Sequence, residues 1–139
     1  MTYYAILDTN VLVSAMLRMS SVPGQLLSKA LIGEIVPVFN DDIISEYREV
    51  LKRPKFHFDA NAVGILLSAI LERGLHMDAS ELSTDDVPLP DPKDIVFYQV
   101  TLSAREVCDA YLVTGNAKHF PVKAFVVSPR EMLDIINKG

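Results

Sequence analysis

The fold is expected to form around Tyr3-Tyr4-Ala5-Ile6-Leu7-Asp8-Thr9-Asn10, an apolar run that leads directly into an acid, a hydroxyl and an amide. An apolar run without polar alternation is typical of a strand buried on both faces, at the centre of a parallel sheet. Ligands of such sheets bind outside the carboxyl ends of the strands, where Asp8 is expected to lie. Asp8 is therefore a candidate site residue. The simpler alternative is that Asp8 or Asn10 only caps the helix predicted to follow.

The rest of the chain alternates between helical and strand patterns. Further strands are predicted at 35–39, near 75–77, at 109–113 and at 124–127, although Pro37 weakens the first of these. Val22-Pro23-Gly24 predicts a break between the first two helices. Strands that alternate with helices predict an α/β fold with a parallel sheet and helices on both faces.

Size and composition indicate a single globular domain covering residues 1–139, with half of the residues hydrophobic and a net charge of −5. No apolar run is long enough to span a membrane, and no signal peptide is recognisable, so a cytoplasmic location is expected. Cys108 is the only cysteine and cannot form an internal disulfide. The acidic balance argues against a broad basic face that coats nucleic acid, but not against a nuclease, because bound divalent cations reverse the local charge.

Glu46 is the second candidate site residue. It lies at the border of the apolar stripe of a helix predicted to begin after Asn40, whereas Glu49 points to the opposite side. Glu46 is therefore expected near the packed face. The alternative, equally weighted, is a surface ion pair with Arg48 or Lys52.

A basic run with interleaved aromatic residues follows that helix: Lys52, Arg53 and Lys55 precede Phe56 and Phe58. Cations are common at the carboxyl end of a helix for electrostatic reasons, and this is the simpler interpretation. The functional interpretation is a basic, aromatic lip that grips a phosphate backbone or stacks a base.

Two later stretches supply further candidate residues, and the second of them repeats the pattern of the opening stretch. Asp91-Pro92-Lys93-Asp94 is a helix start, in which Asp91 fits the N-cap and Asp94 the third helical position. Such acids need no other explanation, yet capping and metal ligation are compatible within one turn. The predicted strand at 109–113 ends in Thr114, Gly115 and Asn116.

The candidate residues favour an acid-based metal site. The sequence contains no phosphate-binding glycine motif, and neither Cys108 nor the histidines fit a nucleophilic triad or a zinc motif. A phosphatase that starts with a strand ending in Asp would need a second acid where Asn10 stands. Carboxylates without imidazole suit Mg²⁺ or Mn²⁺, which prefer oxygen ligands.

Taken together, these motifs resemble those of the PIN-domain family of metal-dependent ribonucleases, and most closely its VapC-like branch of toxin–antitoxin systems. The resemblance covers nearly the whole chain, and the motifs that carry it are Leu-Asp-Thr-Asn-Val at 7–11, Ser-Glu-Tyr at 45–47, Asp-Pro-Lys-Asp at 91–94, Leu-Val-Thr-Gly-Asn at 112–116 and Lys-His-Phe at 118–120. It implies a three-layer α/β/α fold around a parallel sheet of about five strands.

The resemblance also implies roles for the candidate residues. Asp8, Asp94 and Glu46 would cluster around Mg²⁺ or Mn²⁺ as catalytic and ligand residues, with Asp91 as an accessory acid. The supporting residues would be Thr9, Asn10, Thr114 and Asn116, and the candidates for RNA contact are Lys52, Arg53 and Lys55. Asn116 departs from the pattern, because many relatives carry Asp there. Carboxylates about 5 Å apart repel by roughly 3 kcal/mol per pair, and a divalent cation would remove that repulsion.

The function expected from these observations is a metal-dependent endoribonuclease. The resemblance further suggests the toxin of a toxin–antitoxin pair, a homodimer that a small antitoxin protein neutralises. The alternative is a PIN-like module of weakened catalysis that acts through RNA or protein binding, with Asn116 as the sign of lost activity.

Overall fold

The structure of the chain is a computed structural model that describes residues 2–79 and 92–139. Its strands are β1 (Tyr3–Leu7), β2 (Ile35–Phe39), β3 (Leu75–His76), β4 (Ala110–Val113) and β5 (Val126–Val127). Its α-helices are α1 (Thr9–Leu17), α2 (Val22–Leu31), α3 (Asp41–Leu51), α4 (Ala60–Arg73), α5 (Pro92–Arg105) and α6 (Pro129–Lys138), and two short 3₁₀ helices are η1 (Pro54–Phe56) and η2 (Ala117–His119). None of the helices in this described part is long and apolar enough to cross a bilayer.

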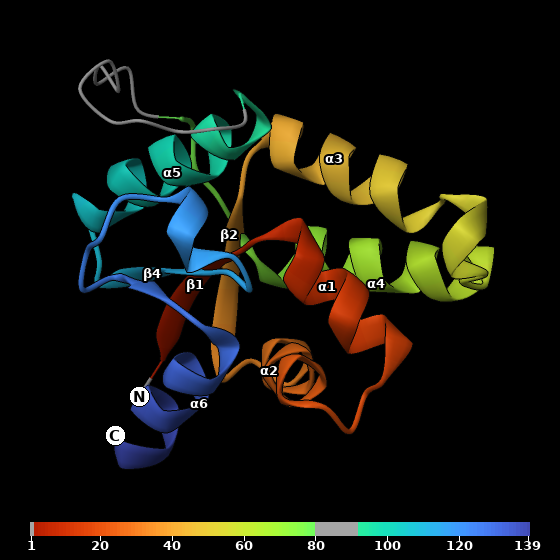
Figure 1. Cartoon of the computed structure of the whole chain (residues 1–139), viewed down its shortest axis with the longest axis horizontal. Helices are drawn as coiled ribbons and strands as arrows, with labels where there is room; N and C mark the ends of the chain where they lie inside the picture. The colour runs from red at the N-terminus through yellow and green to blue at the C-terminus, as the bar shows by residue number, and fades with distance from the viewer. Residues whose placement is uncertain (1, 80–91) are drawn as a thin grey trace.

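The five strands form one parallel sheet in the order β3-β2-β1-β4-β5, which places β1 at its centre. Helix α5 packs against β1, β2 and β4, whereas α2 packs against β2 and α6 against β4 and β5. Figure 1 shows α5 on one side of the sheet and α2 and α6 on the other. The α/β fold, with a parallel sheet of about five strands covered on both faces, is therefore confirmed.

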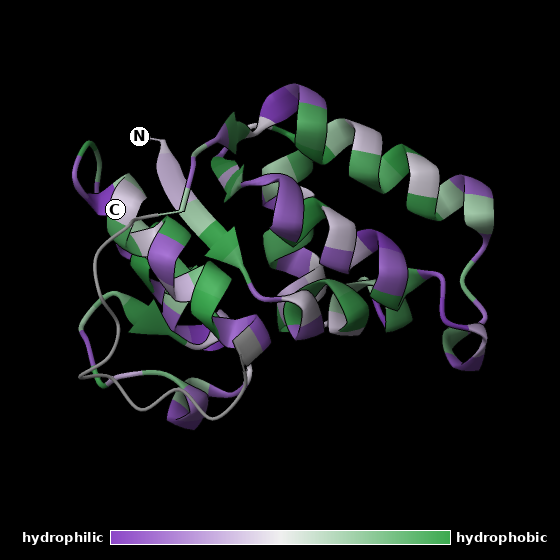
Figure 2. Cartoon of the chain, turned by 90° about the horizontal axis from the view of Figure 1, so that it is seen from above, coloured by the Kyte–Doolittle hydropathy of each residue, from purple (hydrophilic) through white to green (hydrophobic). Residues whose placement is uncertain are grey.

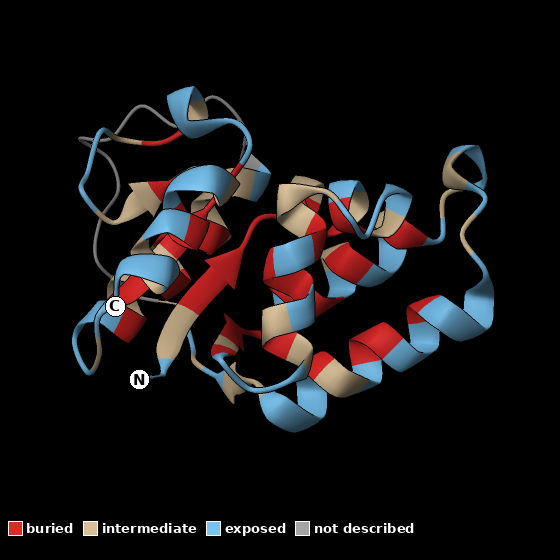
Figure 3. Ribbon diagram, turned by 90° about the horizontal axis from the view of Figure 1, so that it is seen from below, coloured by how far each residue is buried: buried red, intermediate tan, exposed pale blue. Residues whose placement is uncertain are grey.

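Strand β1 becomes more buried along its length. Tyr3 and Tyr4 are half-buried, whereas Ala5, Ile6 and Leu7 are almost completely inaccessible to solvent. Figures 2 and 3 show this as a change from hydrophilic to hydrophobic and from intermediate to buried along the strand that starts at the N-terminus. Asp8 therefore follows directly after the buried end of β1, which is surrounded by apolar side chains.

Strand β2 forms despite Pro37. Pro37 lies opposite Ala5 of β1, and β3 begins only opposite Val38. The proline therefore precedes the short pairing with β3, so that its missing N–H group interrupts little of the sheet.

The break predicted at Val22-Pro23-Gly24 is wrong, because these residues form the first turn of α2, which Ser21 caps. Proline is tolerated in a first helical turn, where its missing N–H group has no intrahelical partner. Gly24 is required for space, since a Cβ there would lie 2.2 Å from the backbone oxygen of Met19.

Gly74→Ala is expected to destabilise the protein by about 1–3 kcal/mol, the range for overpacking. A Cβ at Gly74 would lie 2.5 Å from the carbonyl oxygens of both Ile70 and Pro37, which belong to the backbone and cannot simply rotate away. Gly64→Ala is the matched control on the exposed side of α4, where a Cβ meets nothing within 4 Å. It should stabilise the helix by about 0.5–1 kcal/mol. Denaturant unfolding measures both, and equal stabilities would contradict this packing.

Candidate functional site

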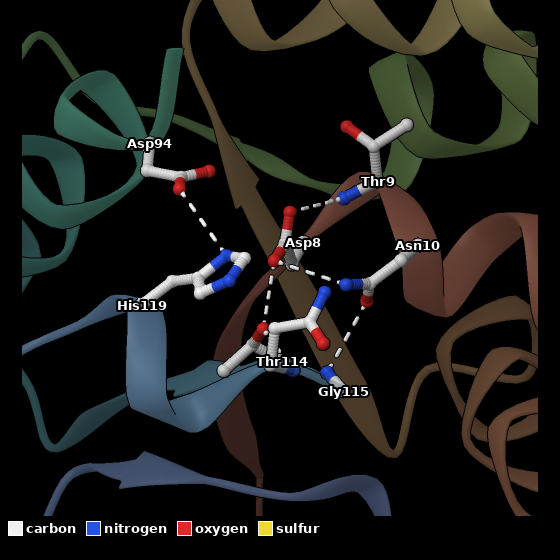
Figure 4. A network of polar contacts seen from close by, with 8 residues as sticks. Asp8, Thr9, Asn10, Asp94, Thr114, Gly115 and His119 are labelled. Carbon is white, nitrogen blue, oxygen red and sulfur yellow. Dashed lines mark hydrogen bonds and ion pairs between the residues drawn. The ribbon is translucent and has the colours of Figure 1, made fainter. Parts of the chain in front are cut away.

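Asp8 joins the central strand to α1 and is only 7% exposed. Its Oδ1 accepts the N–H of Thr9 at 2.8 Å, which caps α1, while its Oδ2 accepts the hydroxyl of Thr114 at 2.7 Å. The side-chain amide of Asn10 donates to the same Oδ2 at 3.4 Å. Figure 4 shows these groups converging on the carboxylate. Asp8 is thus the helix cap that the simpler interpretation expected, and it also lies at the edge of the sheet where a ligand would bind.

The end of β4 is tied to the end of β1. Asp8 donates its backbone N–H to the carbonyl of Val113 at 2.9 Å. Gly115 donates its N–H to the side-chain oxygen of Asn10 at 3.2 Å (Figure 4). Thr114, fully buried, donates its hydroxyl to Asp8 and accepts the backbone N–H of Asn116 at 3.0 Å. These contacts hold Thr114 and Asn10 in fixed positions around Asp8.

Glu46 reaches the same edge of the sheet from α3. It is half-buried and accepts a hydrogen bond from the Thr9 hydroxyl, while Glu49 is exposed and pairs with Arg53. The next residue, Tyr47, is fully buried and donates its hydroxyl to the carbonyl of Leu7 at the end of β1. Burial raises the pKa of Tyr47 well above its usual value, and the charges of Asp8 and Glu46 add to this. Tyr47 therefore stays protonated and anchors α3 beside Asp8.

Asp94 comes from the first turn of α5, and its Oδ2 lies 3.8 Å from Nδ1 of His119 on η2. Figure 4 shows His119 pointing toward Asp94 from the β4 side of the site. Asp91, the predicted accessory acid, lies outside the described residues. His119 was not among the predicted site residues. It lies in the Lys-His-Phe motif at 118–120, five positions after Thr114.

One pocket of about 340 Å³ brings the three predicted acids together. It is lined by Asp8, Thr9, Asn10, Val13, Glu46, Val50, Arg53, Phe56, Lys93 and Asp94. A larger depression of about 780 Å³ lies along the outer side of α4, but among its lining residues only Glu72 and Arg73 are charged. The smaller pocket is the candidate site because all three predicted acids line it.

As placed, the acids do not form a ready metal cage. Among residues 2–79 and 92–139, no group of three or more His, Cys, Asp or Glu side chains is arranged to hold a metal ion. Glu46 is instead bonded to Thr9, and Asp94 faces His119. The structure therefore places the predicted ligands around one pocket without joining them into one cluster.

The electrostatics of the pocket act most clearly on Asp8. Burial raises the pKa of Asp8 above its ordinary value of 3.8. The hydrogen bonds from Thr114 and from the Thr9 backbone lower this pKa, the negative charge of Glu46 raises it, and His119 lowers it. Burial outweighs the hydrogen bonds, so the ionised carboxylate is held at a cost in free energy.

The remaining candidates divide between this pocket and its surroundings. Arg53 lines the acidic pocket, whereas Lys52 and Lys55 are exposed and do not. Asn116 lines a neighbouring pocket of about 260 Å³, which shares Asn10 with the acidic pocket. Asn116 therefore does not line the pocket of the acids. Its backbone N–H donates to the hydroxyl of Thr114.

The class of protein is an α/β domain with a parallel sheet, whose carboxyl edge carries a pocket lined by acids from the β1–α1 junction, α3 and α5. A family model described as PIN domain matches residues 4–118, so the chain belongs to the PIN-domain family. Nuclease activity is the general activity that this membership indicates. No curated protein and no solved structure matches the chain.

Asp8→Asn is expected to gain stability relative to the metal-free parent as the pH rises from about 4 to about 7. Because its folded-state pKa is raised, the contribution of Asp8 to stability is fully present below the unfolded-state pKa of about 4 and is lost as the pH rises toward the folded-state pKa. A neutral amide avoids this loss. Melting temperatures measured in chelator between about pH 4 and about pH 7 should therefore diverge as the pH rises.

The matched control is Asp134→Asn, which removes an exposed carboxylate from α6. Its difference from the parent should stay small throughout. A parent that gains stability over Asp8→Asn as the pH rises would contradict the burial cost assigned to Asp8.

Proposed function

We propose that this PIN-domain protein is a metal-dependent endoribonuclease that hydrolyses RNA phosphodiesters with Mg²⁺ or Mn²⁺. The observation that carries the proposal is that Asp8, Glu46 and Asp94, from three separate elements, line one pocket together with the cations Arg53 and Lys93. The acids supply ligands for a hard cation, and the cations supply charge for a phosphate.

The chemistry of the pocket fits such a cation. Its carboxylate, hydroxyl and amide oxygens are the donors that Mg²⁺ and Mn²⁺ prefer. Asp8, Asp94 and Glu46 would hold the ion, with Asp91 as an accessory acid. In the absence of a metal, Glu46 accepts the hydroxyl of Thr9 and Asp94 lies beside His119. A bound divalent cation would offset the carboxylate repulsion and lower the pKa of a water molecule for attack on phosphorus.

Other residues in and around the pocket would orient the acids, the attacking water and the substrate. Thr9, Asn10 and Thr114 fix the orientation of the Asp8 carboxylate through the hydrogen bonds described above. Glu46 orients the attacking water or accepts its proton. Arg53 and Lys93 neutralise phosphate oxygens at the pocket. Asn116 would contact the substrate in the neighbouring pocket, which shares Asn10 with the acidic pocket.

We further propose that the protein is a cytoplasmic toxin of the VapC-like branch, a homodimer held inactive by a small antitoxin protein. The support is the order and spacing of the sequence motifs together with the PIN-domain match. A short DNA-binding-type reading frame beside the gene, whose product relieves growth arrest on co-expression, would identify the antitoxin. Absence of both arrest and cleavage would contradict the toxin role.

Asp8→Asn and Asp94→Asn are each expected to lower manganese-dependent RNA cleavage by about a hundredfold or more, because several kcal/mol of charge stabilisation is lost. Cleavage of a structured RNA in Mn²⁺, with and without chelator, measures this. Asp134→Asn, exposed on α6, should cleave like the parent.

Thermal melting separates loss of the metal from loss of the fold. Mn²⁺ at a hundred times its dissociation constant should stabilise the parent by about 2.7 kcal/mol and should stabilise Asp8→Asn much less. A parent that melts at the same temperature with and without Mn²⁺ would contradict the proposed metal site. A parent that binds RNA without cleaving it would favour a binding module.

Neutralising Lys52, Arg53 and Lys55 together should weaken RNA binding and lower its salt dependence, because these cations lie at and beside the acidic pocket. If each meets one phosphate, the slope of log affinity against log salt should fall by about two for single-stranded RNA. The matched control replaces Arg73, Lys123 and Lys138, which are exposed and do not line that pocket. Equal slopes for the two triple variants would contradict a role of the basic run in RNA binding. The run would then be explained by its position at the carboxyl end of a helix.

A further inference from the structure

Phe56 lies at the acidic pocket on a specially shaped turn. It ends η1 and lines the same pocket as Asp8, Glu46 and Asp94. Its ring stacks on Phe58 with the centroids 5.5 Å apart and the planes at 13°. Between them, His57 has a φ of 54°, the only positive φ of a non-glycine residue in the described part of the chain. A left-handed residue of this kind costs of order 1 kcal/mol and persists only where its surroundings require it.

The hydrophobic core does not account for Phe56. Phe58 is partly buried and packs against the core, but Phe56 does not belong to that cluster and is only half-buried. Phe56 is thus an aromatic ring supported from the core side by Phe58 and held beside the candidate active site. A half-exposed ring fixed in this way leaves aromatic surface on which a flat ligand can stack.

The cations around this ring are held by contacts that a ligand can replace. The Lys55 ammonium lies 5.1 Å from the centroid of Phe56, an exposed contact worth about 0.5–1 kcal/mol. Arg53 pairs with Glu49 at 3.5 Å, and both side chains are substantially exposed, so this pair contributes little. A base stacked on an aromatic side chain is worth about 1–3 kcal/mol, which is more than the Lys55 contact.

We infer that Phe56 is the stacking platform for an unpaired base of the RNA strand, next to the phosphate that the acidic pocket receives. The base takes the place of the Lys55 ammonium over the ring, and Arg53 and Lys55 meet the phosphates on either side of it. The substrate class is therefore RNA with unpaired nucleotides at the cleavage point. A paired base would first have to be unstacked, at a cost of a few kcal/mol. This inference rests on the proposed ribonuclease function for the identity of the strand.

The test measures binding of a fluorescent oligoribonucleotide in chelator, where no cleavage interferes. Phe56→Leu, which keeps an apolar side chain without an aromatic face, should bind the single strand at least about fivefold more weakly, and Phe56→Trp should retain affinity. The same oligonucleotide in a duplex should bind all three proteins equally. The matched control is Phe125→Leu, which removes a half-buried ring that stacks on Tyr98 near Arg105 and does not line the acidic pocket.

An abasic nucleotide scan keeps the inference testable even if Phe56→Leu is unstable. One abasic position adjoining the cleavage point should weaken binding to the parent by a similar factor, and should have no further effect on Phe56→Leu. Equal binding of the parent to intact and abasic strands, or of Phe56→Leu and parent to the single strand, would overturn the platform while leaving cleavage and its dependence on Asp8 intact. A parent that neither binds nor cleaves RNA would overturn the ribonuclease function, and this subsite with it.

Discussion

The Asp8 carboxylate has to remain hydrogen-bonded while it is almost completely buried at the end of the central strand, and the site depends on this constraint. A buried carboxylate without partners would cost several kcal/mol. The Thr114 hydroxyl and the Thr9 N–H supply these hydrogen bonds. Each bond requires a particular arrangement of the neighbouring elements. Strand β4 has to pair with β1 in register, and α1 has to begin directly after Asp8. Fold and site therefore share the same few contacts, so a change that disturbs one of them disturbs both.

The other two acids of the pocket also contact polar groups of the protein. Thr9 donates to Glu46, and His119 lies beside Asp94, so that acids with mutual repulsion can line one pocket. Burial nevertheless raises the pKa of Asp8, and the charge of Glu46 raises it further. Such a pocket stores unfavourable electrostatic energy that a bound cation would release. This is the physical link between the acidic residues of a PIN domain and divalent-cation chemistry.

The pocket also combines opposite charges within a short distance. Arg53 and Lys93 line it together with the acids, and Phe56 adds an apolar surface. A chain with a net charge of −5 can approach a polyanion only where cations are concentrated locally. Arg53 caps η1 and Phe56 ends it, so this short helix brings a cation and an aromatic ring to the same pocket as the acids.

By itself the sequence determined the order of the elements, the parallel sheet and the acids at strand and helix ends, because hydrophobic periodicity and capping residues act over a few positions. The break at Val22-Pro23-Gly24 was misread, since a first helical turn accepts proline as readily as a loop does. Only the tertiary structure decided which side chains meet. It placed Arg53 and Phe56 in the acidic pocket, His119 beside Asp94, and Asn116 in the next pocket. These contacts join residues from elements far apart in the chain, and their distances are set by the packing of helices on the sheet, which no local pattern encodes.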